Sequence, residues 1–193
     1  MWRHIGPAFR LMIAFTVLTG FIYPAVITGL CQVFFPHQAN GSLIIVRGRV
    51  RGSSLIGQNF AGPEYFHPRP SAADSPGYDP MASGGSNLGP TSRALYERVK
   101  ADVAQFRQEN PTYRGPIPAD AVTASASGLD PDISPGSALA QAARIARARG
   151  VSLRRIRRLV QEHTQHRQLG FLGEPRVNVL EINRALDRRF PRR

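Results

Sequence analysis

The chain has 193 residues, a length that suits one ordinary domain or a small domain with an appendage. Lysine and arginine number 25 against 13 acidic residues, a formal net charge of +12, and 42% of the residues are hydrophobic, which is enough apolar material for a core. The single cysteine, Cys31, excludes an internal disulfide framework and a zinc site built from several cysteines. The surplus positive charge admits nucleic acid, lipid headgroups or acidic proteins as partners.

An apolar run from Leu11 to Phe35 contains no charged residue. A helix needs roughly 20 such residues to cross the hydrocarbon core of a bilayer. A cleaved signal peptide has a shorter apolar core, about 7–15 residues, followed by a site of the Ala-x-Ala type, and no such site follows this run. A buried helix of a soluble protein rarely runs this long without a charge. The sequence therefore predicts a retained transmembrane helix over residues 11–35.

The short tail that precedes this helix, residues 1–10, carries two arginines and no acidic residue. Three further arginines lie within residues 47–51, so a bare count of charges on the two sides is nearly balanced. Long domains cross a membrane largely regardless of their charge, which gives the short tail more weight. We expect the tail to lie in the cytoplasm. Residues 36–193 are then expected to form one soluble domain on the periplasmic or extracellular side of the cell membrane.

The soluble part begins with a β-branched segment, residues 43–50, which predicts a strand. Residues 51–90 are rich in Gly, Pro, Ser and Asp and are expected to be mostly irregular. Thr91 or Ser92 can cap a helix that ends at Asn110, before a proline. The spacing of its apolar residues is typical of one helical face: Leu95, Val99, Val103 and Phe106.

Three further helices are predicted from their end signals. Ser134-Pro135 supplies a hydroxyl cap and a proline at the first helical position, and Gly150 is typical of a helix end. Ser152 is expected to cap the next helix, and Asn178 followed by Glu181 resembles a capping box. Strand and helices together predict an α+β domain. The expected inward residues are Leu139, Ala142, Ile145 and Ala146; Leu153, Ile156, Leu159, Val160 and His163; and Val179, Ile182 and Leu186.

Arginines cluster between Arg144 and Arg158. Nucleic-acid binding is disfavoured, because the cluster has no interleaved aromatic residues for base stacking and no recognised nucleic-acid motif. An acidic protein surface or lipid headgroups remain open as partners of the cluster. The glycine-rich segment 83–89 leads toward a helix N-terminus but lacks the Gly-Lys-Ser/Thr end of a phosphate-binding loop. A loop packed on the domain is therefore favoured there over a nucleotide cradle.

Other residues that could carry chemistry do not converge. His163 and His166 lie near Glu162, yet no third metal ligand is evident. A hydrolase that uses Ser125 or Ser127 as its nucleophile is disfavoured. No acid–histidine partner can be assigned to either serine, and the motif Gly-x-Ser-x-Gly is absent. We therefore predict no catalytic, cofactor-binding or metal-ligating residues in this chain.

Small and polar residues recur at roughly four-residue intervals within the apolar run: Thr16, Gly20, Thr28 and Gln32. Such residues on one face suit helix–helix packing in a membrane. This pattern favours a partner subunit over an enzyme that acts alone.

The sequence resembles the C subunit of the Kdp potassium-transporting ATPase. Several of the matching strings are long and unusual, and their order and spacing fit along nearly the whole chain. Two departures are Ala126, where the family usually has glycine, and Asp132, where it often has histidine. The matching stretches are residues 38–43, 57–58, 65–73, 78–79, 83–92, 122–125, 127–131, 133–135 and 169–180.

The resemblance implies an accessory, non-catalytic subunit of a high-affinity, ATP-driven potassium importer. A channel-like subunit would carry the ions and a P-type subunit would hydrolyse ATP, so ATP and potassium act at the level of the complex. Family members are described as assembly factors, or as catalytic chaperones that raise the ATP affinity of the P-type subunit. The alternatives are an independent anchored enzyme that uses Ser125 or Ser127, and a domain that binds lipid or polyanions through residues 144–158.

We expect the partner interface to combine the membrane helix with the loops 65–71 and 83–92, which are dense in special residues without a catalytic arrangement. The candidate interface residues are Thr16, Gly20, Thr28, Gln32, Gln58, Tyr65, Phe66, His67, Arg69, Ser71, Ser83, Gly84, Gly85, Ser86 and Asn87.

Overall fold

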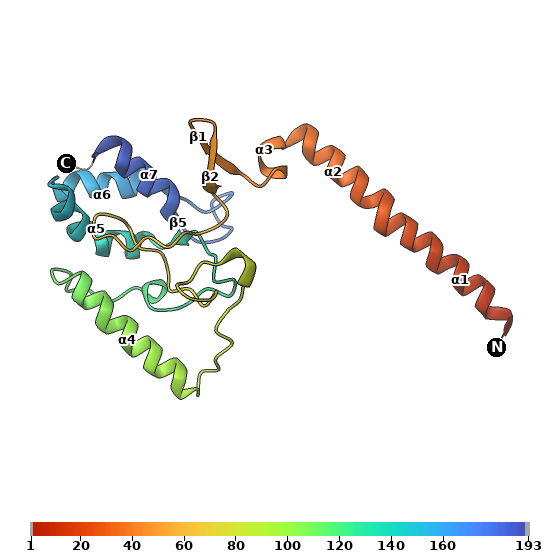
Figure 1. Cartoon of the computed structure of the whole chain (residues 1–193), viewed down its shortest axis with the longest axis horizontal. Helices are drawn as coiled ribbons and strands as arrows, with labels where there is room; N and C mark the ends of the chain where they lie inside the picture. Colours follow the sequence, from red (N-terminus) through yellow and green to blue (C-terminus); the bar gives the residue numbers. More distant parts are fainter. Residues whose placement is uncertain (1, 192–193) are drawn as a thin grey trace. The chain divides into compact units, whose positions relative to one another are not determined.

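A computed structural model describes residues 2–191. The chain divides after Ser53 into two units, a first unit built on a long apolar helix and a second that forms a globular domain (Figure 1). The mixture of helices and strands confirms the predicted α+β class with an N-terminal apolar helix.

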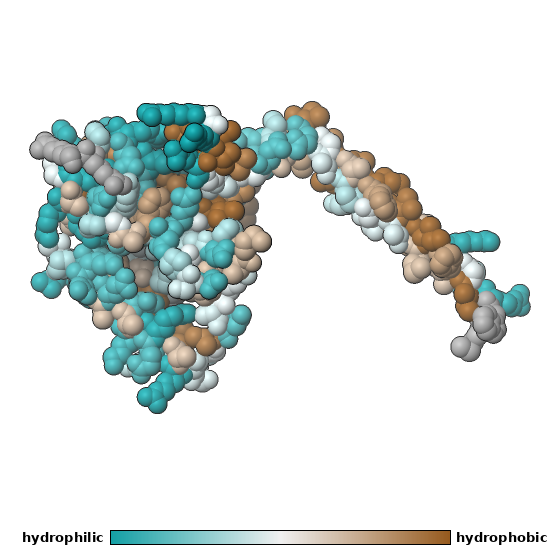
Figure 2. Space-filling model, in the orientation of Figure 1, coloured by the Kyte–Doolittle hydropathy of each residue, from teal (hydrophilic) through white to brown (hydrophobic). Residues whose placement is uncertain are grey.

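The first unit begins with the helix that was predicted to cross a membrane. It runs through α1 (Trp2–Val17), a π-helical turn (Leu18–Ile22) and α2 (Tyr23–Phe34), so residues 2–10 are helical and continuous with the apolar run. Arg3–Phe34 is long and apolar enough to cross a membrane, with a mean hydropathy of 2.0 in its most apolar stretch, none of which is buried. Figure 2 shows hydrophobic side chains along much of its surface. These properties are those of a single-pass membrane anchor.

The π-helical turn has a local cause in the sequence. Pro24 has no backbone N–H, and its ring would collide with the carbonyl four residues earlier, that of Gly20, in a regular helix. The wider turn avoids this collision, and the Tyr23 N–H donates to the carbonyl of Leu18, five residues earlier. The helix therefore continues past the proline with one additional residue taken up in the turn.

The rest of the first unit corrects the prediction of a single strand over 43–50. After the short α3 (Pro36–Ala39), β1 (Leu43–Val46) and β2 (Arg49–Ser53) form an antiparallel hairpin. Arg47 and Gly48 form its two-residue turn with φ of 51° and 74°, the positive values that such turns require. The signal was missed because arginine is not a usual residue at the first of these turn positions.

Over residues 54–191, the second unit combines a small sheet with four α-helices. β3 (Asp132–Ile133), β5 (Arg176–Asn178) and β4 (Thr164–Gln165) pair antiparallel in that order. Between Ser53 and β3 the chain is mostly irregular, as predicted for residues up to 90, except for two 3-10 turns (Pro80–Ala82 and Ala119–Ala121) and α4. The helices are α4 (Arg93–Glu109), α5 (Pro135–Arg149), α6 (Leu153–Glu162) and α7 (Val179–Arg189).

The predicted helix ends are confirmed with one exception. The hydroxyl groups of Ser92 and Ser134 accept hydrogen bonds from the backbone N–H three residues later, and the Asn178 side chain does the same for Glu181. Gly150 ends α5 with φ of 63°. Ser152 occupies the N-cap position of α6, but its side chain makes no capping hydrogen bond.

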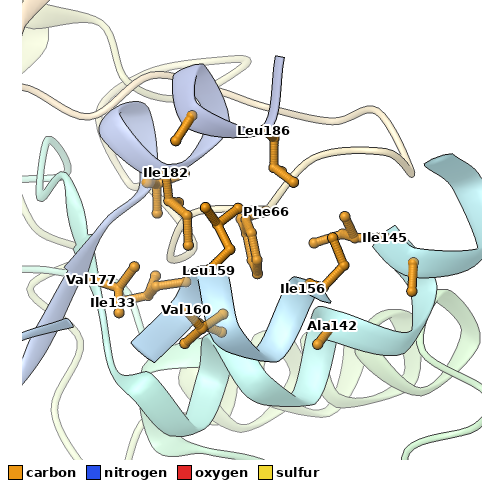
Figure 3. Close-up of a cluster of buried hydrophobic side chains, with 14 residues drawn as sticks. Phe66, Ile133, Ala142, Ile145, Ile156, Leu159, Val160, Val177, Ile182 and Leu186 are labelled. Atoms are coloured by element: carbon orange, nitrogen blue, oxygen red, sulfur yellow. The ribbon is translucent and has the colours of Figure 1, made fainter. Parts of the chain in front are cut away.

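The core lies between α5, α6, α7 and the sheet, and it encloses Phe66 from the irregular region (Figure 3). Most predicted inward residues are buried, but Leu139 is 41% exposed and its prediction was wrong. The buried face of α5 follows Ala138, Ala142 and Ile145, and Leu139 lies about 100° away from Ala138 around the helix. The fully buried members include Ile145, Ile156, Leu159, Val177, Ile182 and Leu186.

Candidate partner interface

The segment 65–71 is attached to the helices by two amide side chains. The Phe66 N–H donates to Asn183 Oδ1 at 2.8 Å, and Asn183 Nδ2 donates to the Phe66 carbonyl at 2.9 Å. Gln141 makes the same pair of bonds with the His67 backbone, at 2.8 and 3.2 Å. The two amide side chains thus satisfy backbone N–H and carbonyl groups that would pair with a neighbouring strand in a sheet. Phe66 itself is fully buried in the core, which corrects its expected place in an interface.

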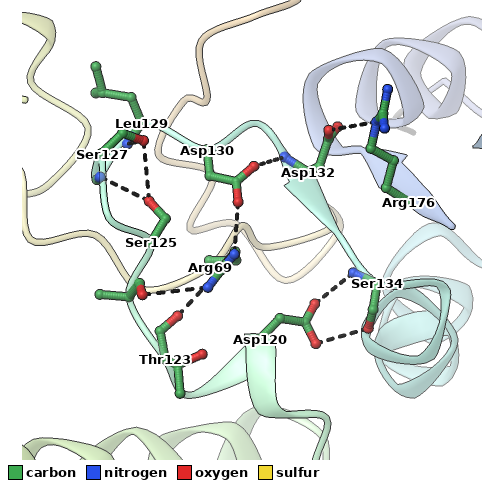
Figure 4. A network of polar contacts seen from close by, with 12 residues as sticks. Arg69, Asp120, Thr123, Ser125, Ser127, Leu129, Asp130, Asp132, Ser134 and Arg176 are labelled. Atoms are coloured by element: carbon green, nitrogen blue, oxygen red, sulfur yellow. Dashed lines mark hydrogen bonds and ion pairs between the residues drawn. The ribbon is translucent and has the colours of Figure 1, made fainter. Parts of the chain in front are cut away.

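Arg69 and Asp130 connect this segment to the turn that precedes β3 (Figure 4). Arg69 Nη1 lies 2.8 Å from Asp130 Oδ2, and the same guanidinium reaches the carbonyls of Thr123 and Ala124. The Tyr78 hydroxyl donates to the Arg69 carbonyl at 2.9 Å. Burial raises the pKa of Tyr78 far above its ordinary value, so the phenol stays protonated as a donor. Arg69 therefore holds the loops in place.

Ser71 stabilises the same region through a single hydroxyl. Its Oγ donates to the Gly128 carbonyl at 2.7 Å and accepts from the backbone N–H groups of Ala73 and Tyr78 at 3.1 and 2.9 Å. Both lone pairs and the proton are used, so the hydroxyl is fully satisfied. Ser71 fixes the loop conformation.

The glycine-rich loop 83–89 packs on the turn 125–128, as the sequence favoured. The Gly84 N–H and the Ser83 hydroxyl both donate to the Ser127 carbonyl, at 2.9 and 3.0 Å. A Cβ on Gly85 would lie 2.9 Å from the Ala126 carbonyl oxygen, closer than real Cβ contacts come, whereas one on Gly84 would meet only an atom 3.9 Å away. The close backbone approach explains a glycine at position 85.

The loop surface is rigid but partly open to solvent. Tyr65, His67, Arg69 and Ser71 are half-buried, as are Gln58, Gly84, Gly85 and Ser86, whereas Ser83 and Asn87 are exposed.

A buried charge network lies beneath this surface. Arg144 is 9% exposed, and its guanidinium donates to the carbonyl of Pro63 at 2.8 Å, to Gln141 Oε1 at 2.7 Å and to Asn110 Oδ1 at 3.2 Å. It also lies 3.1 Å from His67 Nε2, while His67 Nδ1 lies 3.0 Å from Glu109 Oε2. Burial lowers the pKa of Arg144 to about 10, so the group is still charged at neutral pH. Arg144 thus joins α5, the end of α4 and residues 63–67.

The pKa of Glu109 gives this network a pH dependence. The hydrogen bond from His67 is the main cause that holds the Glu109 pKa below its ordinary value of 4.5. The stabilisation is therefore complete above that value and is lost as the pH falls through the lowered folded-state pKa. We expect Glu109→Gln to reduce the free energy of unfolding at neutral pH and to matter progressively less in acid. Urea unfolding at several pH values would show the two curves converging as the pH falls through this lowered pKa.

The exposed Glu97 on the same helix provides the control for that experiment. For Glu97→Gln, we expect the difference in free energy of unfolding from the unmodified chain to be nearly the same at every pH. A difference for Glu109→Gln that stays constant from neutral to acid pH would argue against stabilisation of the Glu109 carboxylate by the hydrogen bond from His67.

The arginine cluster separates into two groups that the sequence did not distinguish. Arg149, like Arg144, is buried: it donates to the carbonyls of Glu64 and Phe190 and to Asp187, and it lies 5.0 Å above the ring of Tyr65. The arginines of α6 are exposed: Arg154, Arg155, Arg157 and Arg158. Together with the exposed Arg147 of α5, the second group is available to an external partner.

The other candidates for chemistry have local structural roles. Ser125 Oγ and Ser127 Oγ accept hydrogen bonds from the N–H groups of Gly128 and Leu129 and shape a turn. His163 Nδ1 lies 3.0 Å from the Leu159 carbonyl of its own helix. Within residues 2–191, no three His, Cys, Asp or Glu side chains group so that they could hold a metal ion.

The π-helical turn brings the polar stripe of the membrane helix onto one face. In a regular helix, Thr16 and Gln32 would point about 160° apart. The additional residue of the π turn rotates the C-terminal half of the helix back by about 100°, which leaves Thr16, Gly20, Thr28 and Gln32 within about 60° of one another. The Thr16 hydroxyl donates to the Met12 carbonyl at 2.8 Å, and the side-chain amide of Gln32 bonds that of Asn40. The four-residue spacing alone would not have produced this face.

Sequence reasoning missed the buried polar residues that organise the loops, namely Gln141, Arg144 and Asn183. A signal was present for two of them. Asn183 lies on the apolar stripe of α7 between Val179 and Leu186, and Gln141 lies beside Ala138 on that of α5. A polar residue inside an apolar stripe is expected to have a buried partner. Which backbone segment it binds cannot be obtained from the helix alone.

These observations define the class of protein: a single-pass, membrane-anchored α+β domain whose loop surface is fixed from within. Comparison with known proteins identifies the family. Residues 5–188 match the family model described as "K+-transporting ATPase, c chain". The chain belongs to the KdpC family.

Relatives match over nearly their whole lengths. The potassium-transporting ATPase KdpC subunits of Rhodospirillum rubrum and Myxococcus xanthus are 57% and 58% identical over 191 residues. These matches cover 99% and 98% of this chain and 98% and 90% of the relatives. The KdpC subunit of Geobacter sulfurreducens is 54% identical over 190 residues, all of that protein. The chain is therefore a KdpC subunit of the Kdp potassium-transporting ATPase complex, a membrane complex with other Kdp subunits.

Proposed function

We propose that this chain is an accessory, non-catalytic subunit that stabilises the Kdp complex and helps it to assemble. A P-type partner subunit hydrolyses ATP and a channel-like partner subunit carries potassium. ATP and potassium therefore act at the level of the complex. This chain contributes protein contacts, through its membrane helix and through its rigid loop surface.

The observation that carries the proposal is how the polar side chains of the loops are used. Arg69 bonds Asp130 and two carbonyls, His67 bonds Glu109, and Ser71 bonds three backbone groups. An active site instead directs a nucleophile, a base and an orienting group toward one reacting atom. Side chains that bond one another in this way support a rigid binding surface, because they fix backbone positions without converging on a substrate.

We place the N-terminus in the cytoplasm and the globular domain on the periplasmic or extracellular side. The basic residues before the helix support this orientation. A domain on that side does not meet cytoplasmic ATP. Any increase in the ATP affinity of the P-type subunit, the catalytic-chaperone role, would then be transmitted through contacts between subunits.

We assign the membrane part of the interface to Thr16, Gly20, Thr28 and Gln32. Their shared face presents a glycine and hydrogen-bonding side chains, which allow close approach of a neighbouring helix. The outer part is assigned to the accessible side of the loops: Gln58, Tyr65, His67, Arg69, Ser71, Ser83, Gly84, Gly85, Ser86 and Asn87.

Gly85→Ala tests the loop part of this interface. The new Cβ would collide with the Ala126 carbonyl oxygen, so the loop 83–89 must move off its turn. We expect reduced recovery of the assembled complex and reduced potassium uptake at micromolar potassium, while the full-length chain in detergent still folds. Co-purification and uptake with this variant measure both effects.

Gly136→Ala is the matched control, because a Cβ at that position makes only ordinary contacts, the nearest at 3.6 Å, and Gly136 lies outside the residues assigned to the interface. It should assemble and transport as the unmodified chain does. If Gly85→Ala also assembles and transports normally, the loop 83–89 is not part of the interface.

A further inference from the structure

A second feature of the domain is exposed and apolar, and it lies outside the loops described above. Residues 167–174, here named the 167–174 hairpin, connect β4 to β5. Its tip presents Leu169, Phe171 and Leu172, which are 83%, 69% and 48% exposed. None of the three belongs to the hydrophobic core. Large apolar side chains gathered on one exposed tip mark an interaction site.

The hairpin is ordered by its own hydrogen bonds. Gln168 and Leu172 exchange two backbone hydrogen bonds, both of 2.9 Å. At its base, Arg167 Nη2 lies 2.9 and 2.8 Å from the two carboxylate oxygens of Glu174. Leu169 has a positive φ of 52°, a conformation that is unfavourable for a branched residue. A preformed tip loses little conformational freedom when it binds, which favours affinity.

The charges around the hairpin indicate the kind of partner. Arg167 is neutralised by Glu174, and Arg176, just beyond the hairpin, lies 3.1 Å from Asp132. A loop that inserts among anionic lipid headgroups usually presents basic residues without acidic partners. A rigid apolar tip with a charge-balanced base instead fits a desolvated pocket with a polar rim, as at the centre of a protein–protein interface.

We propose that the 167–174 hairpin inserts Leu169 and Phe171 into an apolar pocket on another protein subunit of the Kdp complex. The inference rests on the proposed accessory function and adds a contact to it. The tip residues are anchors for the partner, whereas the loops 65–71 and 83–89 are a separate surface.

The test compares full complexes that contain the double variant Leu169→Asn/Phe171→Ser. Asparagine tolerates a positive φ better than leucine does, so the turn is kept while the tip becomes polar. Loss of two anchor residues should increase the rate at which this chain is lost from the complex during detergent washing by about tenfold or more. The thermal unfolding of the purified full-length chain should not change. The variant Phe171→Leu keeps an apolar tip, so the chain should stay in the complex. Tyr96→Ala removes a similarly exposed side chain from α4 and is the matched control, which should also stay in the complex.

A photo-crosslinking residue at position 171 identifies the molecule that the tip contacts. A covalent adduct with a Kdp subunit supports the proposal. An adduct with lipid alone, or retention of the double variant equal to that of the unmodified chain, overturns it. If the unmodified chain itself does not co-purify with other subunits, the proposed accessory function fails as well, so the two failures are distinguishable.

Discussion

Replacing Arg144 by methionine is expected to lower the free energy of unfolding of the globular domain by about 3–5 kcal/mol. The guanidinium is 9% exposed and bonds Pro63, Asn110 and Gln141. Methionine keeps the apolar stem but supplies no donors, so buried acceptors lose their partners and Glu109 loses a nearby positive charge. Urea unfolding of the full-length chain in detergent, followed by circular dichroism, measures the loss.

Arg147→Met provides the control, because Arg147 is one turn further along α5 and is exposed. Its effect should stay within about 0.5 kcal/mol. Equal effects of the two substitutions would show that the buried network does not stabilise the fold.

Phe66→Ala is expected to cost about 3–5 kcal/mol, because it removes a fully buried ring from the centre of the core and leaves a cavity. The loss should also loosen the 65–71 segment, which is attached at the same residue by Asn183. The same unfolding experiment measures the stability, and limited proteolysis of the full-length chain measures the loosening.

Phe171→Ala removes the same side chain from an exposed position and should change the stability by no more than about 0.5 kcal/mol. If both substitutions cost the same, Phe66 is not a core residue. The pair also separates folding from binding, since the proposed contact of the hairpin predicts that Phe171 matters in the complex and not in the isolated chain.

Much of the fold was predictable because it depends on local signals. The charge-free run 11–35 coincides, up to Phe34, with part of the apolar helix, and the caps at Ser92, Ser134 and Asn178 mark observed helix starts. The errors also have local causes. The 43–50 strand is a hairpin because Arg47 and Gly48 adopt a turn without its usual residues.

The arrangement of the site was less predictable, because it depends on contacts between distant residues. The sequence indicated that 65–71 was special, but nothing in it showed that Asn183, 117 positions away, would pair with the Phe66 backbone. The expected place of Phe66 in an interface was wrong because its ring is buried in a core formed by helices that are distant in the sequence. Similarly, one face of the membrane helix depends on a π turn caused by Pro24, which a count of residue spacings does not include.

The net charge of +12 also has a more specific meaning in the structure. Arg69, Arg144 and Arg149 are structural, since they bond carbonyls and carboxylates inside the domain. Their planar guanidinium groups reach several acceptors at once, which the ammonium group of lysine would not do in the same geometry. The positive charge is thus partly consumed in holding irregular loops together.

The proposed role of this chain, an accessory subunit that acts through protein contacts, can be tested directly by purification. The tagged, full-length chain would be purified from its native membrane in mild detergent. We predict that two larger membrane subunits, the channel-like one and the P-type one, are recovered with it at a fixed stoichiometry. Recovery of the chain alone, under conditions in which the other subunits remain intact, would contradict the proposed role.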